Sequence, residues 1–238
     1  SWLIGWSETT VRAGAALSYI GVVLVTVLLG RTLFSERAGL WAGFITATTL
    51  QLIISAHVGV YDTLLLLLTL LALWALYAGF SFGSQRHFLI AAAAMGLGAL
   101  AKGPVAFVYP LLIMLPFAMM HDDVNGRKET RITRIHGTTI VWGIVIFFAI
   151  AAPWFLSQAL VHGDKFIAYL LGYQSFGRYF DVVENQTGAW WYYLPLIPVG
   201  FIPWTGTLVG GLATLVSIIR TRQGQFLGDP DVDAESFA

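Results

Sequence analysis

A succession of long apolar stretches, separated by short polar turns, dominates this sequence. A helix needs about 20 consecutive apolar residues to cross the hydrocarbon core of a bilayer. The stretches occupy residues 11–30, 38–56, 63–80, 88–101, 104–120, 138–160 and 191–219. The sequence therefore predicts an all-α fold, a polytopic transmembrane helical bundle of about seven spans. We expect the fourth and fifth stretches to form a tight helical hairpin, and the last to kink at Pro195, Pro198 or Pro203.

The supply of charge supports this prediction. Only 11% of the 238 residues are charged, whereas a soluble domain carries roughly 25%, so lipid must cover most of the surface. A hydrophobic content of 57% excludes intrinsic disorder, and the absence of cysteine excludes a disulfide scaffold. The charges balance at 13 basic and 13 acidic residues without a long basic run, which argues against a nucleic-acid partner. The predicted organisation is a transmembrane domain over residues 1–222 and a polar, acidic, disordered tail over residues 223–238.

The distribution of lysine and arginine predicts the orientation, because cytoplasmic loops are enriched in both. Seven spans divide the basic residues into two sets. The larger set contains Arg31, Arg37, Arg86, Arg127, Lys128, Arg131, Arg134, Arg220 and Arg222. The smaller set contains Arg12, Lys102, Lys165 and Arg178. We therefore expect the first set inside, and the loops at residues 57–62, 102–103 and 161–190 outside, with the chain integral to a bacterial inner (cytoplasmic) membrane.

The outer loops contain ionisable residues, which are expensive near a membrane and often functional. Asp62 precedes the third stretch, where it either caps the helix or directs a carboxylate into an outer cavity. Lys102 either snorkels from a helix end or offers a point charge to a phosphate. Arg178 either stacks among aromatic residues and pairs with a nearby carboxylate, or clamps a phosphate. The aromatic run at residues 190–193 is typical of an interfacial belt and could also line a lipid groove. Together these residues suit a ligand with an anionic head and an apolar tail.

Several short segments, in order, resemble one family. They are residues 5–12 (GWSETTVR), 31–34 (RTLF), 37–40 (RAGL), 61–65 (YDTLL), 96–104 (GLGALAKGP), 152–154 (APW), 176–180 (FGRYF), 191–193 (WYY) and 202–204 (IPW). The set is similar to the polyprenyl-phosphate-dependent GT-C glycosyltransferases, the superfamily of protein O-mannosyltransferases and lipid A aminoarabinose transferases. The resemblance extends over about residues 1–206.

The resemblance implies roles for individual residues. Asp62 would lie in the acceptor or metal region as the catalytic-site candidate, and Lys102 and Arg178 would bind the donor phosphate. His57, Tyr192 and Tyr193 would belong to a groove for lipid or substrate. The implied partners are a polyprenyl-phosphate-sugar lipid and membrane lipids, with membrane protein partners as a further option. The cofactor stays open, a divalent metal being the candidate.

The family pattern also includes an earlier helix and a long outer loop with an Asp-Glu pair, one carboxylate of which is the proposed general base. This sequence contains no Asp-Glu dipeptide. We therefore expect a chain that is incomplete at both its N- and C-terminal ends relative to the family. Sugar, acceptor and metal identity stay open.

Three functions are consistent with these features. The first is transfer of a sugar from a polyprenyl-phosphate-linked donor to an acceptor on the outer, periplasmic face of the membrane. The second is a non-catalytic subunit, derived from such a glycosyltransferase, that binds lipid or packs in a larger membrane complex. The third is a transporter or flippase, which is supported neither by a sequence repeat nor by a charged residue in the middle of an apolar stretch.

Overall fold

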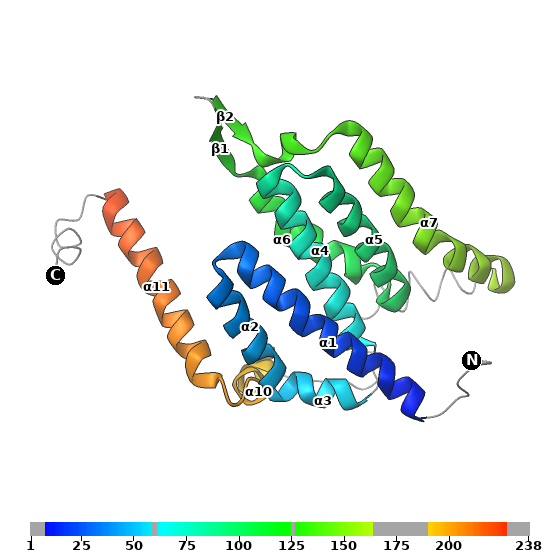
Figure 1. Cartoon of the computed structure of the whole chain (residues 1–238), viewed down its shortest axis with the longest axis horizontal. Helices are drawn as coiled ribbons and strands as arrows, with labels where there is room; N and C mark the ends of the chain where they lie inside the picture. The colour runs from blue at the N-terminus through cyan, green and yellow to red at the C-terminus, as the bar shows by residue number, and fades with distance from the viewer. Residues whose placement is uncertain (1–7, 59–60, 125–126, 164–189, 228–238) are drawn as a thin grey trace.

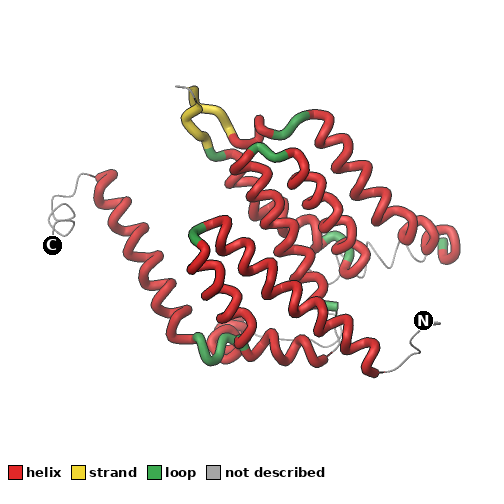
Figure 2. Tube along the Cα trace, viewed as in Figure 1, coloured by secondary structure: helices red, strands yellow, loops and turns green. Residues whose placement is uncertain are grey.

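A computed structural model of the chain describes residues 8–58, 61–124, 127–163 and 190–227. Helices make up nearly all of this part, as Figure 2 shows. The helices are α1 (Glu8–Leu33), α2 (Glu36–Thr48), α3 (Leu50–Val58), α4 (Asp62–Phe82), α5 (Gln85–Lys102), α6 (Val105–Met119), α7 (Gly137–His162), α10 (Tyr193–Gly200) and α11 (Thr205–Leu227), with short 3₁₀ turns η1 (Arg131–Arg134) and η3 (Trp190–Tyr192). The strands β1 (His121–Val124) and β2 (Arg127–Thr130) form one antiparallel hairpin. The predicted all-α fold is confirmed.

The helices form a bundle around α4 (Figure 1). Helix α4 packs against α1 on one side and against α5 and α6 on the other, and α5 packs in turn against α7. Helix α2 folds back along α1, and α3 lies across the lower end of the bundle in Figure 1. Helix α10 meets α3 at that end, and α11 leads away from it.

Small residues let α4, α5 and α6 approach closely, as is usual where membrane helices pack. The principal buried cluster comprises Ala75, Leu76, Phe80, Phe88, Ala91, Met114 and Ala118. Within it, the rings of Phe80 and Phe88 meet edge to face with centroids 5.0 Å apart. The helices α6 and α7, by contrast, carry many exposed apolar side chains, which suits contact with lipid.

Glycine determines how α1 and α2 meet. A Cβ atom built on Gly39 would lie 2.6 Å from the carbonyl oxygen of Val27 and 2.5 Å from Cγ of Arg31. Because backbone atoms cannot retreat from such a contact, only glycine fits at this crossing. Gly30 meets the backbone of Gly39 at the same crossing, where an added Cβ atom would lie 2.8 Å from Cα of Gly39, so the pairing of α1 and α2 depends on residues without side chains.

Among the described residues, three helices are long and apolar enough to cross a membrane, namely residues 12–33 of α1, then α4 and α7. The number rises to five if each of two bent helix pairs forms one span. Helix α6 is apolar but has only 15 residues, and α5 begins with Gln85, Arg86 and His87 and ends with Lys102. The predicted total of about seven therefore exceeds what length and composition of the described helices support by themselves.

Two predicted spans are broken. Residues 38–56 do not form one straight helix, because α2 ends at Thr48 and α3 begins at Leu50 at an angle of 57°. The last stretch bends by 118° between residues 200 and 205. Of the three prolines proposed as kink points, Pro203 lies in this bend and Pro198 lies inside α10.

Two polar parts of the chain remain, the connection at residues 121–137 and the C-terminal tail. The connection at residues 121–137 contains the β1–β2 hairpin and η1. Helix α11 continues to Leu227, so the boundary predicted between residues 222 and 223 falls inside a helix. Residues 228–238 of the predicted tail lie outside the described residues.

Candidate functional site

The structure brings together two of the predicted site residues, Asp62 and Lys102. Nζ of Lys102 forms an ion pair with Oδ1 of Asp62, although 40 residues separate them in the sequence. Asp62 is the first residue of α4 and Lys102 is the last residue of α5. The antiparallel packing of these two helices places both charges at the same end of the bundle.

The helix dipoles stabilise both charges. Asp62 lies in the first turn of α4, where unpaired backbone N–H groups and the helix dipole favour an anion. Lys102 lies in the last turn of α5, where the dipole favours a cation. Of the two interpretations of Asp62 left open by the sequence, the cap in the strict sense is wrong, because the N-cap residue is Tyr61. The electrostatic part of that interpretation holds.

The backbone beside each charge is firmly placed. Thr63, which follows Asp62, is only 2% exposed, and its hydroxyl lies 3.5 Å from the carbonyl oxygen of Ser55 in α3. Gly103, which follows Lys102, has φ 71° and ψ −146°, and its N–H donates to the carbonyl of Ala99. Only glycine adopts this conformation readily, so Gly103 ends α5 directly after the ammonium group.

Sequence reasoning missed Thr63 as part of the site. The signal was weak, because a threonine after an aspartate at a helix start is common for many reasons. The positive φ of Gly103 directly after Lys102 is likewise not visible in the sequence.

The other predicted residues are less closely connected with the pair. Nδ1 of His57 donates to the carbonyl oxygen of Ile53 at 2.7 Å, a bond within α3 that leaves the ring exposed. Tyr192 is exposed in η3, and Tyr193 begins α10, but the side chain of Tyr193 lies outside the described part. Arg178 and most of the loop at residues 161–190 also lie outside the described residues.

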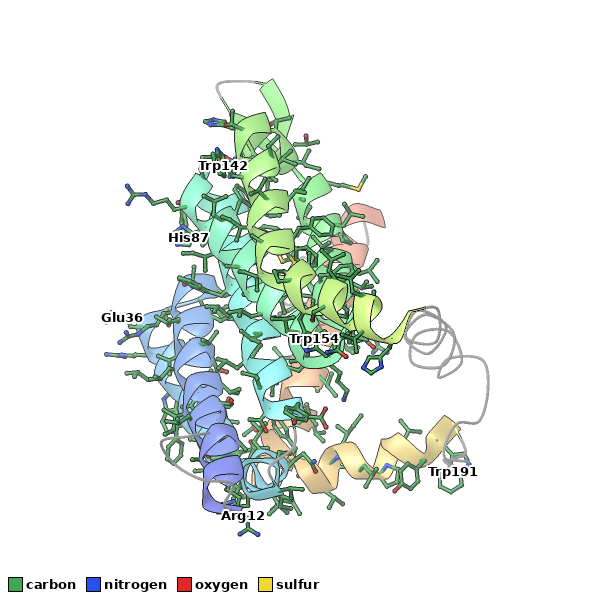
Figure 3. All side chains as sticks on the ribbon, turned by 90° about the vertical axis from the view of Figure 1, so that its right-hand side faces the viewer. Arg12, Glu36, His87, Trp142, Trp154 and Trp191 are labelled. Atoms are coloured by element: carbon green, nitrogen blue, oxygen red, sulfur yellow. The ribbon has the colours of Figure 1, made fainter. Side chains whose placement is uncertain are left out.

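The opposite end of α4 is basic. The Arg134 guanidinium donates to the carbonyl oxygens of Phe80 and Ser81 at 2.6 and 2.8 Å, and thus caps the C-terminal end of α4. The guanidinium of Arg131 lies 4.2 Å from the ring centroid of Phe117 near the end of α6. In Figure 3, Arg12 and Trp191 lie toward one end of the molecule, and His87 and Trp142 toward the other.

A single glutamine joins the basic connection to the bundle. Nε2 of Gln85 donates to the carbonyl of Arg134 at 2.8 Å. Its Oε1 accepts from the Thr139 hydroxyl at 2.7 Å and from the backbone N–H of His136 at 3.1 Å. The turn between α4 and α5, the 3₁₀ turn and the start of α7 therefore meet at one amide. The Asp62–Lys102 pair and this basic end lie at opposite ends of the same helix.

An all-α bundle with long apolar helices, exposed apolar faces and charges at the two helix ends defines an integral membrane protein. A sequence model described as dolichyl-phosphate-mannose-protein mannosyltransferase matches residues 1–156. The chain belongs to this family, and the resemblance to the GT-C glycosyltransferases drawn from the short segments is thereby confirmed.

Two similar curated proteins are both named as arabinosyl transferases of an undecaprenyl phosphate-linked sugar. The chain is 26% identical to the undecaprenyl phosphate-α-4-amino-4-deoxy-L-arabinose arabinosyl transferase of Edwardsiella ictaluri, over 89% of this chain and 37% of that protein. It is 29% identical to transferase 1 of the same name from Pseudomonas fluorescens, over 94% of this chain and 40% of that protein. The chain thus spans about two fifths of the length of these curated relatives.

A solved structure shares the fold. The structure of ArnT from Cupriavidus metallidurans bound to undecaprenyl phosphate matches with a TM-score of 0.72 and 25% identity, over 86% of this chain and 36% of that chain. The structure of the same protein in the apo state matches with a TM-score of 0.63 over 82% of this chain. The chain therefore has the fold of part of a GT-C membrane module.

Proposed function

We propose that this chain is the membrane-embedded part of a glycosyltransferase that moves a sugar from a polyprenyl-phosphate donor to an acceptor on the outer face of the inner membrane. The observation that carries the proposal is the Asp62–Lys102 pair. It lies at one end of a bundle that belongs to a family of lipid-phosphate-dependent sugar transferases. In this proposal the end with Asp62 and Lys102 faces outward, and the end with Arg131 and Arg134 faces the cytoplasm.

Sugar transfer from a lipid phosphate releases a phosphate whose negative charge grows in the transition state, and fixed cations stabilise such a charge. We assign this task to Lys102 and Arg178. Lys102 is suited to it because Gly103 and the antiparallel packing of α5 on α4 hold it at the same end of the bundle as Asp62. Asp62 belongs to the acceptor side, and His57, Tyr192 and Tyr193 belong to the groove for the lipid or substrate.

A divalent metal is not part of the proposed step. Among the residues that the structure describes, no group of three or more His, Cys, Asp or Glu side chains converges closely enough to hold a metal ion. The proposal also assigns no general base within this chain. It covers donor binding, stabilisation of the leaving phosphate charge, and a reaction at the outer face of the inner membrane.

The test uses the full-length protein in lipid nanodiscs. The names of the relatives make undecaprenyl phosphate-α-4-amino-4-deoxy-L-arabinose the first labelled donor to assay. Lys102→Ala should weaken donor binding and lower transfer, because the phosphate loses one cation. Arg86→Ala is the matched control, since Arg86 is an exposed basic residue at the opposite end of the helical hairpin.

Equal donor binding by the wild type, Lys102→Ala and Arg178→Ala would contradict the proposed phosphate site. Binding that depends on Lys102, without any transfer of labelled sugar, would instead favour the non-catalytic membrane subunit.

A further inference from the structure

The ammonium group that the proposed function assigns to the donor phosphate already has a partner. Nζ of Lys102 is ion-paired with Oδ1 of Asp62. A phosphate oxygen and a carboxylate oxygen seek the same donor groups on an ammonium. A phosphate that approaches Lys102 therefore meets a resident anion, which must move away or be shared.

The exposure of the pair indicates that the exchange is easy. The side chain of Lys102 is 44% exposed and that of Asp62 is 59% exposed. Exposed ion pairs are weak because water solvates both charges, whereas a separated buried pair would leave a charge without solvent. The Asp62–Lys102 pair can therefore open at a small cost in free energy.

Each residue also retains a second source of stabilisation when the pair opens. The Asp62 carboxylate stays in the first turn of α4, beside the positive end of the helix dipole. Lys102 stays in the last turn of α5, beside the negative end of that helix. Opening the pair therefore strands neither charge.

We propose that Asp62 is an exchangeable counterion of Lys102 that competes with the lipid phosphate for the ammonium group. This inference rests on the proposed function and adds a specific task for Asp62. In the unliganded protein the carboxylate neutralises Lys102, and the arriving donor phosphate displaces it. After transfer the carboxylate returns to Lys102 and promotes release of the lipid phosphate product. The exchange replaces one ion pair by another. No covalent bond forms or breaks, and no proton is transferred.

The experiment measures the affinity of the full-length protein for undecaprenyl phosphate and for undecaprenol, which has the same lipid chain and no phosphate. Asp62→Asn removes the competing charge and leaves a side chain of the same shape. The free energy of an exposed ion pair is small, and so is the repulsion between an exposed carboxylate and a phosphate about 4 Å apart. We therefore expect the Asp62→Asn variant to bind undecaprenyl phosphate about two- to tenfold more tightly. Affinity for undecaprenol should not change.

Asp62→Ser is a second variant in case Asp62→Asn does not fold, since serine also removes the charge and keeps a small polar side chain. Glu36→Gln is the matched control, because Glu36 is an exposed acid in the first turn of α2. It should leave both affinities unchanged.

The outcomes separate this inference from the proposed function. Weaker or unchanged undecaprenyl phosphate binding in both Asp62 variants, together with weaker binding in Lys102→Gln, would overturn the counterion and leave the phosphate site intact. Unchanged binding in Lys102→Gln would overturn the phosphate site itself. A shift of undecaprenol affinity in the Asp62 variants, equal to that for the phosphate, would show a change of packing and would also overturn the counterion.

Discussion

The indole N–H of Trp204 donates a hydrogen bond of 2.7 Å to the hydroxyl oxygen of Thr48, 156 residues earlier in the chain. Beside this bond, the backbone N–H of Leu50 donates to the carbonyl oxygen of Ile202 at 2.9 Å. The break between α2 and α3 therefore lies directly against the break between α10 and α11. Where helices break in a membrane, the released backbone groups need partners within the protein, and here each break supplies them to the other.

Loss of the Trp204–Thr48 bond should destabilise this joint. Trp204→Phe keeps an aromatic ring near Phe44, whose centroid lies 5.6 Å from that of Trp204, and removes the indole N–H together with part of the ring. We expect a loss of about 0.5–1.5 kcal/mol in the free energy of unfolding. Thr48→Val should cost a similar amount, and the double variant less than the sum, measured by reversible unfolding in detergent.

Trp142→Phe serves as the control, because Trp142 is 60% exposed on α7 and far from the joint. Strict additivity of the Trp204 and Thr48 substitutions would show that the two side chains do not stabilise the joint through each other.

The joint also shows where sequence reasoning fails. Residues on both sides of Thr49 are apolar enough to continue a helix, so composition predicted one span over residues 38–56. The break depends on partners near Trp204, and no local pattern reveals a partner at that distance. The helix limits at Asp62 and Lys102, by contrast, follow from local signals, an acidic residue before a leucine run and a Gly-Pro pair after the lysine.

The charges at the two ends were predictable in part. Alternation of the turns along the chain placed Asp62 and Lys102 at the same end, and the structure adds that they pair. The bonds of Gln85 were not predictable, because a glutamine in a helical first turn is usually solvated. What distinguishes Gln85 is the return of the chain after η1, which only the tertiary fold determines.

Gly103→Ala should destabilise the turn between α5 and α6. A Cβ atom would meet no neighbour within 4 Å, so the cost comes from the backbone conformation with φ at 71°. We expect a loss of about 1–3 kcal/mol in unfolding free energy. The variant should also weaken undecaprenyl phosphate binding, because Lys102 precedes the distorted residue.

Gly14→Ala should change the free energy of unfolding in the opposite direction to Gly103→Ala. Gly14 lies in α1, where an added Cβ atom would meet nothing within 4 Å and the residue has no positive φ. Alanine should stabilise the helix by about 0.5–1 kcal/mol through helix propensity. Equal effects at both positions would contradict the conformational explanation for Gly103.

Replacement of Gln85 by methionine should loosen the basic end. The apolar side chain fills a similar volume and leaves the Thr139 hydroxyl, whose residue is only 7% exposed, without its acceptor. The Arg134 carbonyl loses its donor as well. We expect a loss of about 1–3 kcal/mol in unfolding free energy, with faster hydrogen exchange at the start of α7. Gln51→Met, at an exposed position of α3, should change neither quantity.

The Asp62–Lys102 pair should contribute little to stability, even though we propose a role for it in binding. Exposed ion pairs are typically worth about 0.2–1 kcal/mol, and both side chains here are more than two fifths exposed. A double-mutant cycle with Asp62→Asn and Lys102→Gln should therefore give a coupling energy within that range, and the coupling should fall further at high salt because water and ions reach both groups. The same variants should shift undecaprenyl phosphate affinity in opposite directions, tighter for Asp62→Asn and weaker for Lys102→Gln. A coupling energy of several kcal/mol that resists salt would mean that the pair is fixed, and a fixed pair could not be exchanged for a phosphate.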